Sequence, residues 1–173
     1  MERPLPNILV TGTPGTGKTT SSEMIADALG LQHVNVGELV REKKFYEDYL
    51  EDLDTHVLDE DKLLDELEEI VKEGGKVVDF HTCEIFPERW FDLVLVLRAD
   101  TSYLYDRMVK RGYNKNKIDE NMECEIMQIV LETAKESYAP EIVVELPSNT
   151  VDDIESNVER CKQWLDAWKS NNQ

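Results

Sequence analysis

The hydrophobic residues of the chain fall into five short, continuous runs that are rich in Val, Ile and Leu. The runs cover residues 8–11, 33–36, 76–80, 93–98 and 142–146. Most of them do not alternate with polar residues, which is typical of strands that are buried on both faces. Longer segments with helical spacing separate them. This order predicts an α/β fold in which helices flank a five-stranded parallel sheet.

Five apolar stripes at helical spacing lie between and after these runs. They comprise residues 24, 25, 28 and 29; 63, 64, 67, 70 and 71; 104 and 108; 122, 126, 129 and 130; and 154, 158, 161, 165 and 168. Glycines follow the first three stripes and predict helix ends there. Thr150 and Asp153 have the spacing of a capping pair for the last helix. We expect a single domain over residues 1–173.

Charge excludes two classes of partner. The 173 residues include 19 Lys plus Arg and 37 Asp plus Glu, which gives a net charge of −18. Duplex DNA and membrane surfaces are also anionic, so we expect the chain to bind neither directly. No apolar run approaches the ~20 residues that span a bilayer. Cys83, Cys124 and Cys161 lack paired spacing, which favours a reducing, intracellular compartment over a disulfide or zinc framework.

Much of the negative charge lies in one segment. Residues 38–73 hold 15 acids and 5 bases, a net charge of −10. Most charge runs are solvated helix faces or loops, and we favour that interpretation for this segment taken alone. A mobile insert over a binding site and a docking surface for a basic partner stay open as alternatives.

Residues 12–19 read GTPGTGKT and match the phosphate-loop motif G-x-x-x-x-G-K-[ST] in full. A predicted strand precedes the motif and a predicted helix follows it, as the motif requires. Gly15 and Gly17 let the backbone approach phosphate oxygens closely. Lys18 brings a positive charge to the β and γ phosphates, and the Thr19 hydroxyl is a ligand for Mg²⁺. The motif therefore predicts binding of a nucleoside triphosphate.

Two further candidates follow the third predicted strand. Asp79 ends the run Lys-Val-Val-Asp-Phe, and a carboxylate at that position suits Mg²⁺ bound through water. His81 lies two residues later. A core or capping role and a role in orienting the attacking group or moving a proton stay equally open for it.

The remaining motifs favour a small-molecule kinase. A GTPase needs N-K-x-D, whereas residues 114–117 read NKNK, and Lys cannot accept hydrogen bonds from guanine. Arg107 and Arg111 share one helix face, where they would clamp transferring phosphates opposite the loop lysine. Arg41 and Arg89 follow predicted strands, so we expect them at the same crevice.

Four segments together carry a family resemblance. These are GTPGTGKTT, VNVGELVRE, VVDFHTCEIFPERWF and LVLRADTSYLYDRMVKRGYN. With them the chain resembles adenylate kinase isoenzyme 6 over essentially its whole length. The resemblance implies a phosphate-loop nucleoside monophosphate kinase fold, with an acidic monophosphate-binding region at about residues 35–57 and a short lid at about residues 110–120.

The resemblance also implies roles for individual residues. ATP would be bound by Gly15, Gly17, Lys18, Thr19, Thr20 and Arg111, and AMP by Arg41 and, on a looser match, Arg89. Lys18, Asp79, His81, Arg107 and Arg111 would be catalytic, with Mg²⁺ held by Thr19 and Asp79. The implied activities are conversion of ATP and AMP into two ADP and hydrolysis of ATP.

The same resemblance also implies a cellular role, a partner and a location. It implies maturation of the small ribosomal subunit, a basic ribosomal protein as partner, and residence in nucleus and cytoplasm. We expect a monomer. The alternative is an ATPase assembly factor whose kinase activity is secondary.

One departure from ordinary adenylate kinases affects the expected chemistry. No Arg lies between Arg111 and Arg160, whereas ordinary members carry further lid arginines. Fewer cations on the transferring phosphoryl group weaken charge stabilisation and the exclusion of water. We therefore expect modest transfer to AMP and competing hydrolysis. Positioning the water is one of the two roles that stay open for His81.

Overall fold

A computed structural model of the chain describes residues 3–50 and 55–172, and a five-stranded sheet lies at its centre. The strands are β1 (Ile8–Gly12), β2 (Gln32–Asn35), β5 (Lys76–Asp79), β6 (Leu93–Arg98) and β7 (Val143–Pro147), in the order β2-β5-β1-β6-β7. Every neighbouring pair is parallel. The predicted fold class is thus confirmed, and each predicted strand is correct to within one residue at either end.

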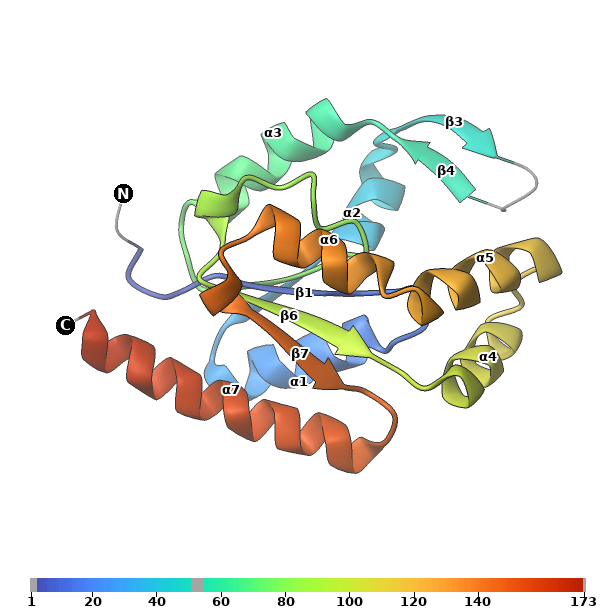
Figure 1. Ribbon diagram of the computed structural model, residues 1–173. Helices are drawn as coiled ribbons and strands as arrows, with labels where there is room; N and C mark the ends of the chain where they lie inside the picture. Colours follow the sequence, from blue (N-terminus) through green and yellow to red (C-terminus); the bar gives the residue numbers. More distant parts are fainter. Residues whose placement is uncertain (1–2, 51–54, 173) are drawn as a thin grey trace.

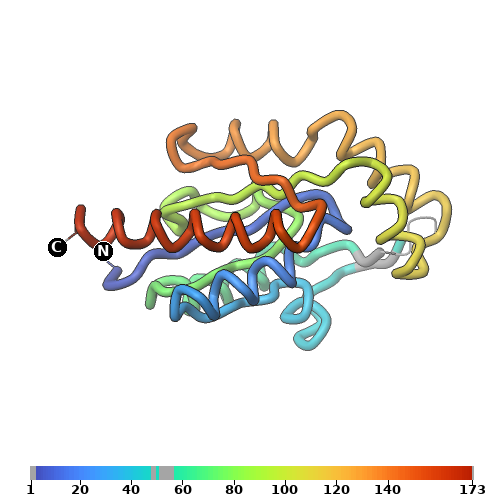
Figure 2. Tube along the Cα trace, turned by 90° about the horizontal axis from the view of Figure 1, so that it is seen from below, coloured from blue at the N-terminus to red at the C-terminus, as the bar shows by residue number. Residues whose placement is uncertain are grey.

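Helices cover both faces of this sheet (Figures 1 and 2). On one face lie α1 (Lys18–Leu29) and α7 (Val151–Asn171), and on the other α3 (Glu60–Val71) and α6 (Ile129–Ser137). Successive strand residues serve opposite layers, because side chains alternate along a strand. Leu9 packs with α3 and α6, whereas Ile8 and Val10 pack with α1 and α7. This double burial explains why the strands have continuous apolar sequences.

Two smaller parts project beyond the carboxyl ends of the strands (Figure 1). One is the helix pair α4 (Thr101–Lys110) and α5 (Lys115–Ile126), which has its own apolar cluster around Leu104, Met108 and Ile118. The other comprises α2 (Val36–Lys43) and an antiparallel hairpin of β3 (Tyr46–Leu50) and β4 (Thr55–Leu58). Short 3₁₀ helices, η2 (Glu88–Trp90) and η3 (Pro140–Ile142), precede β6 and β7.

Two helix predictions need correction. The predicted stripe of α1 is only partly correct: Ile25 is buried and Leu29 packs against the core, but Ala28 is exposed. The buried face also includes Ser21, Ser22 and Ala26. The loop before α1 fixes how the helix begins, so its inward face does not follow the most apolar positions. The capping box of Thr150 and Asp153 in α7 is confirmed.

The predicted helix through residues 122–130 is in fact two helices. Gln128 has a φ of 58°, which ends α5 and lets α6 begin at Ile129. α5 packs against α4, whereas α6 packs on the sheet, and one straight helix cannot do both. None of the helices in the described ranges is long and apolar enough to cross a membrane.

Candidate functional site

The loop between β1 and α1 turns its carbonyl oxygens toward the surrounding protein. The Thr13 carbonyl accepts from the Thr16 hydroxyl at 2.7 Å, and the Thr16 carbonyl accepts from the Ser148 hydroxyl at 2.6 Å. The Gly15 carbonyl accepts from Arg107 Nη1 at 3.2 Å. The Thr16 amide donates to the Thr13 carbonyl at 3.2 Å. Since these carbonyls have donors within the protein, the other backbone N–H groups of the loop are suited to bind an anion.

Gly15 and Gly17 have the left-handed backbone that this loop needs. Their φ values are +97° and +86°, which residues with a side chain rarely adopt. A Cβ at Gly15 would also lie 2.8 Å from Leu104 Cδ1. The loop thus packs directly against α4, and both glycines are required by its geometry.

Lys18 is the first residue of α1 and lines the hollow above the loop. Its Nζ donates to the Thr13 carbonyl at 3.2 Å. Its pKa is lowered to about 8, mainly by burial; Asp79 and Glu125 oppose the shift, and the charge of Arg111 acts in the same direction as burial. A phosphate beside the ammonium would favour its charged form, so binding an anion and keeping the proton are coupled.

The Thr19 hydroxyl and the Asp79 carboxylate meet at the end of β5. Thr19 Oγ1 donates to Asp79 Oδ2 at 3.0 Å, and His33 Nε2 lies 3.0 Å from the same oxygen. Asp79 is only 4% exposed. A hydroxyl and a carboxylate are hard oxygen donors of the kind Mg²⁺ takes beside nucleotide phosphates, so this pair fits the predicted metal. The described residues contain no group of three or more metal-binding side chains.

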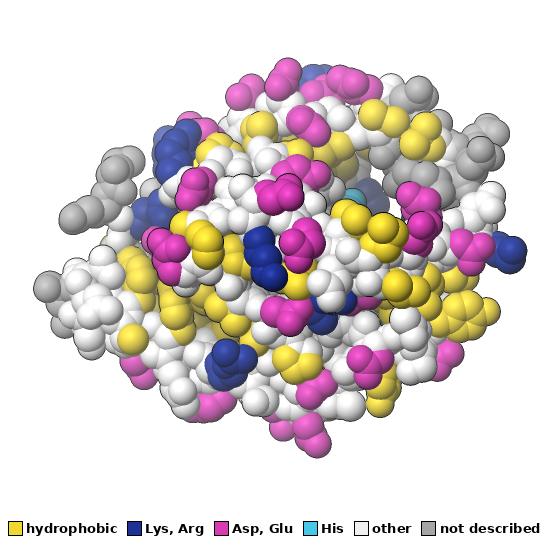
Figure 3. Space-filling view, viewed as in Figure 1, with side chains coloured by type: hydrophobic (Ala, Val, Ile, Leu, Met, Phe, Trp, Pro, Cys, Tyr) yellow, Lys and Arg dark blue, Asp and Glu magenta, His cyan; other side chains and the backbone are white. Residues whose placement is uncertain are grey.

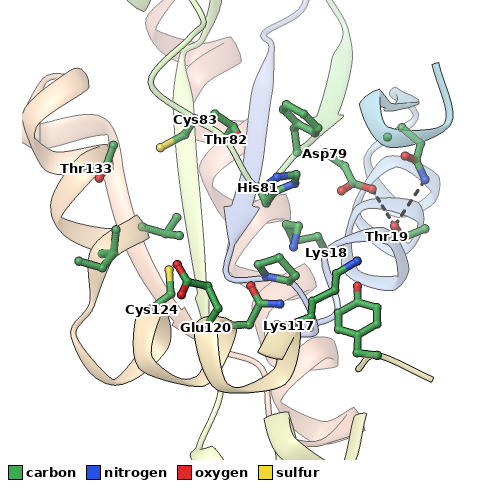
Figure 4. Close-up of a pocket in the computed structure, with 18 of the residues that line it drawn as sticks. Lys18, Thr19, Asp79, His81, Thr82, Cys83, Lys117, Glu120, Cys124 and Thr133 are labelled. Atoms are coloured by element: carbon green, nitrogen blue, oxygen red, sulfur yellow. Dashed lines mark hydrogen bonds between the residues drawn. The ribbon is translucent and has the colours of Figure 1, made fainter. Parts of the chain in front are cut away.

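His81 points into the hollow beside Lys18 (Figure 4). The residue is exposed, and the Phe80 ring packs against it with 4.6 Å between the ring centroids. Its pKa is lowered to about 4, mainly by desolvation and also by the charges of Lys18 and Lys117, while Asp79 opposes the shift. His81 is therefore neutral at physiological pH, where it can donate or accept a hydrogen bond.

The hollow has a volume of about 640 Å³ and opens at the carboxyl ends of β1 and β5. It brings together six predicted site residues: Lys18, Thr19, Arg41, Asp79, His81 and Arg111. Its far wall comes from α5 and α6 and includes Cys124, Val130 and Thr133. Gly15 and Gly17 belong to the adjoining loop, and Thr20 is an exposed residue of α1.

Arg107 and Arg89 do not lie where they were predicted. Arg107 is not part of the described lining of the hollow, and its guanidinium donates to the carbonyls of Gly15 and Asn149 at 3.2 and 2.9 Å. It supports the loop from behind instead of clamping the phosphates.

Arg89 lies at the opposite end of the sheet. It belongs to η2, just before β6 begins, whereas the phosphate loop follows the end of the parallel strand β1. Its side chain is 64% exposed and bonds Glu68 at 2.9 Å. Arg89 is therefore too far from the hollow to make the AMP contact that the sequence predicted.

A buried carboxylate that the sequence reasoning missed connects α5 to the phosphate loop. Glu125 is 3% exposed, and its Oε1 accepts from the Thr13 hydroxyl at 2.9 Å. Its Oε2 accepts from Arg98 Nε at 3.0 Å and from the Ala99 amide at 2.8 Å. The sequence signal was an acid seven residues after the buried Ile118, on the inward face of the helix.

Comparison with known proteins identifies the family. A family described as "AAA domain" matches residues 8–128. An "Adenylate kinase isoenzyme 6 homolog" of Dictyostelium discoideum is 49% identical over 99% of this chain and 98% of its own. The chain belongs to the adenylate kinase isoenzyme 6 family. Homologs in this family from Schizosaccharomyces pombe and Caenorhabditis elegans are 49% and 50% identical, covering 98% and 95% of this chain and 97% and 92% of theirs.

Solved kinases share the fold of this adenylate kinase isoenzyme 6 family member at low sequence identity. A shikimate kinase from Acinetobacter baumannii in complex with shikimate aligns with a TM-score of 0.63 and 16% identity over 96% of each chain. A gluconokinase from Sinorhizobium meliloti aligns with a TM-score of 0.57 and 19% identity, covering 98% of this chain and 97% of its own. The fold is that of phosphate-loop kinases, and with the relatives it supports a nucleotide kinase-like function.

The Glu125 contact predicts an effect of Thr13→Val on ATP binding. The variant keeps the shape of the side chain but leaves Glu125 Oε1 without its donor and frees the loop, so KM for ATP should rise about ten-fold. Thr13→Ser keeps the hydroxyl donor, so its KM for ATP should be close to that of the wild type. Thr101→Val, at an exposed position of α4, is the control. Unchanged ATP binding by Thr13→Val would show that Glu125 does not hold the loop.

The pKa of Lys18 predicts how ATP affinity depends on pH. Bound phosphate raises that pKa above its free value of about 8, so the free protein must take up a proton on binding at higher pH. Affinity should be level near pH 7.5 and fall by up to about ten-fold per pH unit above 8. Calorimetry in buffers of different ionisation enthalpy measures the proton uptake. A level affinity to pH 9 without uptake would contradict the assignment.

Proposed function

We propose that the protein is a nucleoside monophosphate kinase that transfers the γ-phosphoryl group of MgATP to AMP and yields two ADP. The observation that carries this proposal is the meeting of Lys18, the Thr19–Asp79 pair and Arg41 around one hollow. The names of the relatives favour AMP as the acceptor.

Each residue has a role that its position supports. The loop amides and Lys18 would bind the ATP phosphates, and Thr19 and Asp79 would hold Mg²⁺, which neutralises phosphate charge when bound. Arg111 reaches the hollow from the end of α4, where it would meet ATP phosphates. Arg41 reaches it from α2 and would bind the phosphate of AMP. Positioning and charge carry this chemistry, so no strong base is needed.

ATP hydrolysis is proposed as the accompanying activity. A neutral His81 within the hollow can orient a water molecule by a hydrogen bond. Such a water would attack the γ-phosphoryl group when no acceptor is bound. ADP production with ATP alone, compared with ATP plus AMP, CMP or UMP, ranks hydrolysis against transfer and identifies the acceptor. Absence of stimulation by every monophosphate would overturn the kinase proposal.

Arg41→Ala tests the acceptor site. Loss of a charged hydrogen bond to the monophosphate should lower kcat/KM for AMP by about hundred-fold. Hydrolysis of ATP alone should stay within about two-fold of the wild type, since a residue specific to the acceptor is not used there. Arg89→Ala is the matched control, because its guanidinium pairs with Glu68 at the far end of the sheet. An equal fall in hydrolysis would show that Arg41 is not specific to the acceptor.

A second candidate function is an ATPase assembly factor that acts in maturation of the small ribosomal subunit and docks a basic ribosomal protein. A second hollow of about 510 Å³ favours it. The lining includes five glutamates from α2, α3 and the turn after α3: Glu38, Glu42, Glu66, Glu69 and Glu73. Figure 3 shows acidic side chains along the edge over α3. Such work would place the protein in both nucleus and cytoplasm.

Charge reversal tests this docking surface. Glu66→Lys with Glu69→Lys should weaken binding of a Lys- and Arg-rich peptide about ten-fold or more at low salt, since opposite charges are replaced by like ones. Glu155→Lys with Glu159→Lys, on the exposed side of α7, is the control. Fluorescence anisotropy of the labelled peptide at two salt concentrations measures both. Equal weakening by the two pairs would indicate non-specific attraction to an acidic protein.

A further inference from the structure

One cation of the nucleotide hollow has no role in the function proposed above. Lys117 lies in the first turn of α5 and lines the hollow together with Lys18, Arg41 and Arg111. We propose that Lys117 is a further catalytic residue, whose ammonium group contacts the phosphoryl group as it passes from ATP to the monophosphate. The proposal rests on the proposed kinase function and names a residue beyond it.

The side chain of Lys117 enters the same space as the catalytic candidates. Figure 4 shows it rising from α5 toward the region of Lys18 and His81. Lys117 is half-buried, whereas Lys115, two residues earlier on the same helix, has a side chain that is 90% exposed. Lys117 is thus the less exposed of the two lysines and the one that lines the hollow.

Two lysines face the same space from different sides. Lys18, His81 and Lys117 all line the hollow. Figure 4 shows Lys117 on the α5 side of this space and Lys18 beside His81. An anion in the hollow would therefore be attracted by both ammonium groups.

Tyr113 connects the two cations of this lid. The Lys117 ammonium lies 4.1 Å from the centroid of the Tyr113 ring, within the range of a cation–π interaction. The hydroxyl of the same ring accepts from Arg111 Nη1 at 3.4 Å. One aromatic side chain thus connects Lys117 and Arg111, and both belong to the described lining of the hollow.

The backbone around Lys117 is also fixed. The Asn114 side chain caps α5 by accepting from the Lys117 amide at 2.8 Å, and the adjacent Ile118 is 8% exposed in the α4–α5 cluster. A cation in the first turn of a helix is opposed by the helix dipole. Because Lys117 lines the hollow, its charge is also placed to attract a negatively charged ligand there.

The transfer step needs a cation at this position. The bond between the γ-phosphorus and the β–γ bridging oxygen breaks while a phosphate oxygen of the monophosphate bonds to that phosphorus. The electron pair stays on the β-phosphate of the departing ADP, and the ionised acceptor has no proton to lose. Negative charge is spread over the equatorial oxygens in flight. The Lys117 side chain would stabilise that charge opposite Lys18.

Lys117→Met and Lys115→Met form a matched pair of variants on one helix turn. With ATP and AMP, Lys117→Met should lower kcat on the order of hundred-fold, the loss typical of one missing transition-state donor. KM for ATP should change less than about three-fold, because the loop and Lys18 hold the ground state. Lys117→Arg should retain most of the rate, and Lys115→Met all of it.

The outcomes separate this proposal from the function on which it rests. Wild-type transfer to AMP together with a normal kcat in Lys117→Met overturns the role of Lys117 and leaves the kinase function intact. Absence of wild-type transfer with any monophosphate overturns the kinase function itself. Thermal unfolding of all variants checks that they fold. If Lys117→Arg has a normal melting temperature but does not retain the rate, that result also counts against the proposal.

Discussion

A loop that binds phosphate through its backbone must have its carbonyl oxygens held away from the anion. In this protein the carbonyls of Thr13, Gly15 and Thr16 are all held by side chains. Their donors include Arg107 on α4 and Ser148 beyond β7, elements that are far apart in the sequence. The shape of one short loop therefore depends on the assembly of the whole sheet.

The same requirement explains a costly feature of the interior. A buried carboxylate is unfavourable unless it is well paired, and Glu125 meets that condition through Arg98, the Ala99 amide and the Thr13 hydroxyl. These contacts tie β6, α5 and the loop to one another. Because α5 also carries Lys117 and Cys124 into the hollow, Glu125 connects the loop to the opposite wall.

Sequence patterns predicted the features that depend on the burial of residues within a single strand or helix. The strands were recognisable because each serves an apolar layer on both faces, and Asp79 because the carboxyl end of β5 meets the loop. Patterns failed where a distant partner decides the outcome. Tertiary packing decides three features that the patterns missed. These are the exposure of Ala28 in α1, the break between α5 and α6 at Gln128, and the hydrogen bonds of Arg107 to backbone carbonyls. The sequence analysis looked for phosphate-binding cations among the arginines and so missed Lys117. This lysine lines the hollow because of its position on α5.

The distribution of charge bears on the balance between transfer and hydrolysis. The chain has about two acids for every base, yet the described lining of the hollow has four cations and three carboxylates. The shortage of lid arginines is thus partly offset by Lys117. A lysine is a compact point charge, however, and lacks the planar, bidentate grip of arginine. A phosphoryl group held this way is stabilised in charge but less constrained in direction. In the proposed function, water oriented by His81 would then compete with the acceptor, so the proposed dual activity would depend on which cation the lid carries.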